Sequence, residues 1–152
     1  MSGEQRGTMI DIGAVYAQMQ ALAEEINKLR AVEAQMVGSL ESIKRAKDTI
    51  DEFVRLKEGT VLMPLDPQLN GFAYVSIAES DKFIVSLGLN YYAELDSAKA
   101  LEVLSQKERA LNGQLASLRE TLKDYVNLYE RYRQVLEALA AQAQRGTAQA
   151  RK

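Results

Sequence analysis

Two long heptad seams constrain the fold more than any other feature of the sequence. Alternate steps of three and four residues from Ile12 to Val54 reach 13 positions, of which 11 are apolar. The same steps from Leu101 to Ala143 reach another 13 positions, and among these only Glu108 is not apolar. Apolar residues repeated in this way over six heptads are typical of a coiled coil. We therefore expect two helices of roughly 45 residues, each about 65–70 Å long at 1.5 Å per residue.

Each seam needs a partner, because a single long helix buries little apolar surface by itself. The simplest partner is the other helix of the same chain, folded back antiparallel through the middle segment. If Val54 and Leu101 lie near the same end, counting back along both helices places Lys47 beside Glu108. Two of the three charged residues in the seams would then neutralise each other. We predict this ion pair.

The middle segment has the pattern of β-strands. Apolar runs at 60–65 and 72–77 flank a turn rich in Pro, Asn and Gly, and runs at 82–87 and 91–95 flank Gly88-Leu-Asn90. Apolar side chains fall on both alternation faces of these runs. A lone four-stranded sheet in water would leave one of those faces and two edges uncovered. We therefore expect two β-hairpins that associate with other chains.

The composition excludes several classes of function. The 152 residues include no Cys and no His, which removes disulfides, the usual zinc and haem ligand sets and Ser-His-Asp catalysis. No EF-hand spacing or Gly-rich phosphate loop occurs, so we expect no metal, no cofactor and no enzymatic activity. A net charge of −2 gives no general attraction to nucleic acid or to anionic membranes. Without an apolar run of ~18 residues, the chain is expected to be soluble and cytoplasmic.

The order of these parts resembles the archaeal-type α subunit of the prefoldin family. Val61-Leu-Met-Pro-Leu65 opens the first hairpin, and Met63-Pro64-Leu65 corresponds to the Val-Pro-Leu-type opening of that family. The stretch from Asp81 to Gly88, followed by Tyr91-Tyr-Ala-Glu94, is similar to its third and fourth strands. The resemblance covers about residues 9 to 143. Asn90 stands where the family often has a second Gly, and the turn at 66–70 is longer than expected.

The resemblance implies an α+β fold that is mainly α-helical. A long antiparallel two-helix coiled coil would be joined by two central β-hairpins, which build an oligomeric β-barrel with other subunits. The chain would form one domain over residues 1–152, with helices at about 9–57 and 97–145 and the hairpins at 59–95. We expect the residues that mediate this assembly to be Val61, Met63, Leu65, Phe72, Tyr74, Val75, Phe83, Val85, Leu87 and Tyr91.

The resemblance also implies a function, that of an ATP-independent chaperone subunit. Two α subunits would assemble with four β subunits, capture unfolded client proteins at the free ends of the coiled coils, and pass them to a group II chaperonin. An alternative is a tether or scaffold that uses the same coiled coil to bind one defined partner. Selectivity separates the two, because a tether would ignore denatured proteins.

The residues themselves point to the same capture site. In an antiparallel pair of helices the two chain termini lie together, far from the hairpins, where fraying exposes both seams. Flexible methionines suit a surface that must fit many sequences. The seam residues in this region can equally be ordinary coiled-coil core, whereas Ile10, Tyr16 and Val135 lie off the seam. The tail at 145–152 is expected to be disordered. The candidate client-binding residues are Met9, Ile10, Ile12, Val15, Tyr16, Met19, Tyr132, Val135, Leu136 and Leu139.

Overall fold

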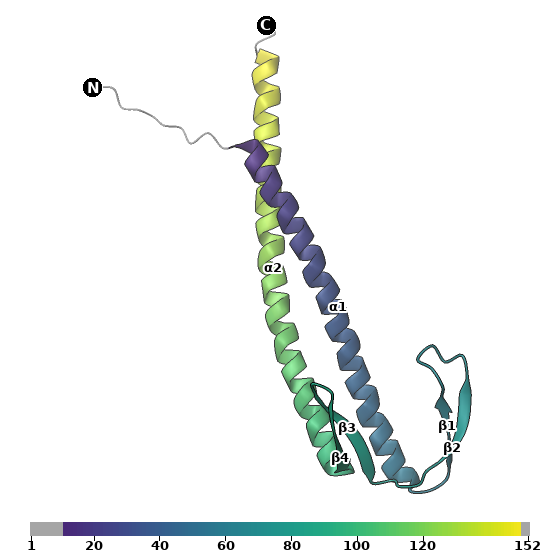
Figure 1. Ribbon diagram of the computed structural model, residues 1–152. Helices are drawn as coiled ribbons and strands as arrows, with labels where there is room; N and C mark the ends of the chain where they lie inside the picture. Colours follow the sequence, from purple (N-terminus) through teal and green to yellow (C-terminus); the bar gives the residue numbers. More distant parts are fainter. Residues whose placement is uncertain (1–10, 150–152) are drawn as a thin grey trace. The chain divides into compact units, whose positions relative to one another are not determined.

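The chain consists of a long helix, two β-hairpins and a second long helix, in that order (Figure 1). The structure is a computed structural model that describes the backbone of residues 11–149 and the side chains of residues 11–145. The predicted fold class, mainly helical with two antiparallel hairpins, is confirmed. The elements in chain order are α1 (Ile12–Leu56), β1 (Thr60–Pro64), β2 (Phe72–Ser76), β3 (Lys82–Gly88), β4 (Tyr91–Asp96) and α2 (Ser97–Gln149).

The helix α2 is longer than the sequence pattern suggested. It continues to Gln149, so the prediction of a disordered tail is wrong for residues 145–149. The reason is the composition of its last turns, in which alanines and glutamines favour the helix, while Gly146 opposes it by about 1 kcal/mol and Thr147 by less. Residues 150–152, the rest of the predicted tail, lie outside the described residues.

The chain groups into two compact units. The first, which we call the arm unit, combines residues up to 35 with those from 115 onward. The second, which we call the hairpin unit, comprises residues 36–114. In each unit a segment of α1 pairs with a segment of α2. The seams supply the contacts, since every position from Val15 to Ile50 in the first seam and from Leu101 to Leu139 in the second is at least partly buried.

The core of the hairpin unit joins one hairpin to the helices. Ile50 of α1, Val85 of β3, and Ala100 and Leu104 of α2 are buried together. The ring of Phe83, also on β3, meets that of Phe53 edge to face at a centroid distance of 6.4 Å. The inner face of β3–β4 therefore rests on residues from both helices.

The two hairpins form separate two-stranded antiparallel sheets. Val61 faces Val75 across β1–β2, and Val85 faces Ala93 across β3–β4, where a bulge interrupts the register between Ser86 and Gly88. Among the described residues, the core cluster of the hairpin unit has members from β3 and β4 but none from β1 or β2. The first hairpin is therefore less covered by its own chain than the second.

The charged residues in the seams are paired. Lys47 Nζ lies 2.9 Å from a carboxylate oxygen of Glu108, so the predicted ion pair is confirmed. The hydrogen bond from Lys47 holds the pKa of Glu108 below its usual value, against the opposing effect of burial, and the charge of Lys44 adds to the lowering. In the arm unit, Arg119 Nε lies 2.6 Å from Glu33. The sequence did not predict this second pair, because Arg119 lies beside the seam and not in it.

We predict that Lys47→Glu destabilises the protein more than Lys47→Ala does. The alanine variant only removes the partner of Glu108, whereas the glutamate variant places two carboxylates together at a partly buried position. The measurement is the free energy of unfolding from urea titrations at pH 7. Lys28 is the matched control, because it is an exposed helix lysine and its Glu and Ala variants should differ much less. Equal losses for the two Lys47 variants would contradict the ion pair.

Candidate functional site

The start of α1 is fixed by its capping residue. Asp11 Oδ1 accepts hydrogen bonds from the backbone N–H groups of Gly13 at 2.9 Å and Ala14 at 3.3 Å, so the helix begins at Ile12. Met9 and Ile10, two of the candidate client-binding residues, lie outside the described residues.

The other eight candidate client-binding residues all belong to the arm unit. Tyr16 and Val135, which lie off the seam, have 51% and 38% of their surface exposed, and Ile12 at the start of the seam is also exposed. The remaining five are half-buried, as expected for residues that also serve the coiled coil; they are Val15, Met19, Tyr132, Leu136 and Leu139. The structure thus separates exposed off-seam residues from half-buried seam residues. Client binding by all of them stays a prediction.

Two grooves run between the helices of the arm unit. One has a volume of about 370 Å³ and the other about 270 Å³. In the larger, the small Ala21 of α1 leaves space beside Leu128 and Tyr132 of α2. The larger groove is lined by Gln18, Ala21, Leu22, Glu25, Tyr125, Leu128 and Tyr132, and the smaller by Ala23, Ile26, Asn27, Arg30, Val126, Tyr129 and Glu130.

Sequence reasoning found Tyr132 but not the rest of these groove residues. The signal available was the placement of alanines at 21 and 23, opposite a helix that carries large aromatic side chains. Small residues facing large ones leave hollows that uniform leucine layers would fill. The grooves are a feature of the arm unit outside most of the candidate client-binding residues.

The first hairpin exposes apolar side chains on both faces. Tyr74 on β2 has 83% of its surface exposed, and Leu62, its cross-strand neighbour on β1, is also exposed. On the opposite face Val61 and Val75 are half-buried, while Met63 is exposed. Leu65 and Phe72, at the turn end of the hairpin, are exposed as well. The candidate assembly residues of this hairpin are therefore mostly open to a partner.

The second hairpin is two-sided. Val85 is buried in the core of the hairpin unit, and Phe83 packs against that core. These two candidate assembly residues therefore attach the hairpin to the helices of its own chain. The outer face carries Ile84, with 75% of its surface exposed, and Tyr92, which is also exposed. Sequence reasoning had left both out, because either face of this apolar run could have been the inner one. Leu87 and Tyr91, both candidates, are exposed near the turn.

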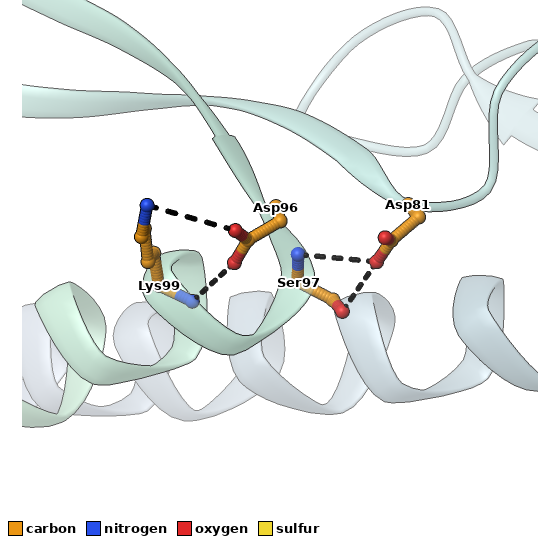
Figure 2. A network of polar contacts seen from close by, with 4 residues as sticks. All are labelled: Asp81, Asp96, Ser97 and Lys99. Carbon is orange, nitrogen blue, oxygen red and sulfur yellow. Dashed lines mark hydrogen bonds and ion pairs between the residues drawn. The ribbon is translucent and has the colours of Figure 1, made fainter.

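Polar contacts fix the second hairpin to the first turn of α2, as Figure 2 shows. Asp96 Oδ1 accepts the backbone N–H of Lys99 at 2.8 Å and caps the helix, as its position in the sequence indicates. Asp81, just before β3, accepts both the hydroxyl of Ser97 at 2.5 Å and its backbone N–H at 3.3 Å. The hydroxyl hydrogen bond is the main reason that the pKa of Asp81 lies below its usual value, and the backbone N–H contributes as well. On the same hairpin, Lys107 Nζ of α2 donates to the carbonyl oxygen of Ser86.

The sequence of the chain matches the model of a known protein family. The family model described as prefoldin subunit matches residues 16–145, which include nearly all of both helices and both hairpins. The chain belongs to the prefoldin family. Prefoldin is a chaperone family whose members form oligomers with other prefoldin subunits. The resemblance found in the sequence is thereby confirmed.

The curated relatives are archaeal α subunits of prefoldin. The prefoldin subunit alpha of Aeropyrum pernix is 39% identical over 127 residues, which cover 84% of this chain and 83% of the relative. That of Metallosphaera sedula is 30% identical over 140 residues, with 91% and 94% covered. A solved chain of filamentous PFD from Methanocaldococcus jannaschii has the same fold, with a TM-score of 0.63 at 24% identity over 74% of this chain and 92% of that one.

Residues 11–149 contain neither a membrane-spanning helix nor a cluster of metal ligands. No helix within residues 11–149 is both long and apolar enough to cross a bilayer. Nor does this described part contain three or more acidic residues grouped as a metal site would need.

We predict that Asp81→Asn lowers the free energy of unfolding at neutral pH. The folded-state pKa of Asp81 is depressed, so its contribution is present above the unfolded value of about 3.8 and is lost as the pH falls through the folded value. The gap between the wild type and the variant should therefore persist above about pH 4 and close below it.

The check is urea unfolding followed by circular dichroism between pH 2.5 and 7. Ser97→Ala removes the hydroxyl that donates to the same carboxylate, so the double variant should lose less than the two single losses added together. Fully additive losses, or a gap that does not change with pH, would contradict this role of the carboxylate.

Proposed function

We propose that the chain is the α subunit of a heteromeric prefoldin that captures unfolded proteins on its arm unit without nucleotide. The observation that carries this proposal is the exposure of apolar residues off the heptad seam, of which Tyr16 and Val135 are the clearest. A coiled coil that needed only to hold its own helices together would place polar residues at such positions. A chaperone arm needs apolar residues there, because unfolded chains expose apolar surface.

The arm surface suits weak and unselective binding. Burial of apolar area contributes about 25 cal/mol per Å² whatever the sequence of the client, and the larger groove adds concave, mainly apolar surface in the same unit. Met19 is half-buried in the seam near this region, and its flexible side chain can adapt to different clients. Several arms acting on one client would raise the total affinity far above that of any single arm. Single substitutions on the arm are therefore expected to have small effects.

The hairpin unit suits assembly. Each hairpin offers strand edges and an exposed apolar face, which are features that other strands can cover. We propose that these hairpins join those of β-type subunits in a shared β-barrel, with two α and four β subunits in the complex. Transfer of the client to a group II chaperonin, a cytoplasmic location and the absence of enzymatic activity complete the proposal, supported by membership in the prefoldin family.

We predict that a variant lacking residues 1–16 and 135–152 loses most of its ability to suppress aggregation while still assembling. The deletion removes Tyr16, Val135 and the surrounding tip but leaves both hairpins and most of both seams. Light scattering of guanidine-denatured lysozyme diluted into buffer measures suppression. Native mass spectrometry of the chain mixed with a β-type prefoldin subunit measures assembly.

A milder variant tests whether the loss of suppression comes from removing apolar surface or from shortening the helices. Tyr16→Ser combined with Val135→Ser should reduce suppression by about half or more at limiting concentrations, since both residues are exposed and contribute area that a client would bury. Leu56→Ser, at the exposed end of α1 in the hairpin unit, is the matched control and should leave suppression unchanged. Unchanged suppression in the truncated variant, or its loss of assembly, would count against the proposed arm function. Binding of one folded partner with no effect on denatured lysozyme would instead favour a tether.

A further inference from the structure

Each hairpin turn holds a leucine in the left-handed backbone region. Leu69, between β1 and β2, has φ 63°, and Leu89, between β3 and β4, has φ 49°. This region is unfavourable for residues with a Cβ atom, which comes too close to the following carbonyl oxygen, so turns that need it are normally built from Gly, Asn or Asp. Both leucines also point an apolar side chain into solvent, with 58% of Leu69 and 93% of Leu89 exposed.

The turn at Leu89 is the tighter of the two. Leu89 and Asn90 both have positive φ and directly connect β3 to β4, which is the pattern of a two-residue type I′ turn. Asn-Gly and Asp-Gly are the favoured pairs in such a turn. Ser86 Oγ accepts the N–H of Gly88, and Gly88 itself has φ 103°, so the turn is ordered up to the leucine. Asparagine in place of Leu89 would satisfy the turn better.

The turn at Leu69 is held by one aspartate. Asp66 Oδ1 accepts the backbone N–H of Gln68 at 2.8 Å and the side-chain amide of Asn70 at 3.1 Å. The carbonyl oxygen of Asp66 accepts the N–H of Leu69 at 3.2 Å, and Leu65 N–H donates to Gly71 O at 2.9 Å across the base of the loop. These bonds fix the loop and leave the leucine side chain outside it.

The same unfavourable combination therefore occurs in both hairpins. Backbone strain lowers the stability of the isolated chain, and the exposed leucine side chains gain little burial that could offset it. Asparagine at either position would relieve the strain with little loss of burial. Strained residues that persist in folded proteins concentrate at binding and switch regions. Other exposed apolar residues lie next to each turn. They are Leu87 and Tyr91 near Leu89, and Leu65 and Phe72 near Leu69.

We propose that Leu69 and Leu89 are assembly anchors, each of which inserts its side chain into an apolar surface of a neighbouring prefoldin subunit. The proposal rests on the proposed function, in which the hairpins are the assembly surface. Another prefoldin subunit is the occupant that fits, because the family forms oligomers of its own subunits and both leucines are continuous with the exposed apolar faces of the hairpins. A turn that is already ordered loses little conformational freedom on binding, so a single leucine on it can act as an anchor.

Leu89→Asn and Leu69→Asn test the proposal, because the predicted effects on stability and on assembly have opposite signs. Each variant should raise the thermal midpoint of the isolated full-length chain, since strain is relieved. Each should also raise the concentration at which the complex with a β-type prefoldin subunit dissociates by tenfold or more, and the double variant should raise it further. Leu89→Met keeps an apolar side chain and is the matched control, with a change below about threefold.

Three outcomes would overturn the anchor role. The first is a complex of unchanged affinity in the double variant. The second is a lower thermal midpoint of the isolated chain, which would mean that the leucines pack within their own subunit. The third is an intact complex that no longer suppresses aggregation of guanidine-denatured lysozyme, which would make the leucines contacts for clients.

A further variant separates failure of this inference from failure of the proposed function. Tyr74→Lys places a charge on the exposed face of the first hairpin, away from its turn, and should abolish the complex if hairpins mediate assembly at all. If Tyr74→Lys abolishes the complex and the asparagine variants do not weaken it, only the anchor role is wrong. If the wild-type chain forms no complex, or Tyr74→Lys leaves it intact, the proposed assembly surface is wrong and the anchor role falls with it.

Discussion

Burial of the apolar seam of one helix against the seam of the other is the interaction on which the rest of the structure depends. Neither helix buries enough surface alone, so the chain has to reverse direction between Leu56 and Ser97. The 40 residues between those two are too few to build a hydrophobic core of their own. They fold as two hairpins, and the second completes its core with Ile50 of α1 and with Ala100 and Leu104 of α2. The first has no comparable support among the described residues, which is why so much of its surface remains open.

The sequence predicted the elements well because their signals are local and periodic. Heptad spacing defined the seams, and counting along them located the Lys47–Glu108 pair at a separation of 61 residues. The strands begin where predicted and end within one residue of the prediction. The errors arose where a weak local signal competed with a stronger one. The position of residues 145–152 at the chain end suggested disorder, but α2 continues to Gln149. Arg119 lies outside the seam, so heptad counting alone did not pair it with Glu33.

The surfaces were less predictable than the elements. Position relative to the seam indicated that Tyr16 and Val135 would be exposed, because a residue off the seam has no facing layer to cover it. The grooves of the arm unit depend instead on which alanine of α1 lies across from which large residue of α2, and that is a property of the pairing. For the second hairpin, alternation identified two apolar faces without identifying the inner one. The packing of Val85 into the core settles that choice and leaves Ile84 outside.

The two hairpins are therefore unequal, and the inequality has a physical consequence for assembly. Asp81, Lys107 and the buried Val85 attach the second hairpin to α2, so its outer face is presented on a fixed support. The first hairpin has apolar residues on both faces, and a two-stranded ribbon is only marginally stable in water without a packed face. If another subunit covers either face, the apolar area buried there stabilises both the hairpin and the interface between the two subunits. Assembly is therefore expected to stabilise the first hairpin more than the second, which already has a packed face in the single chain.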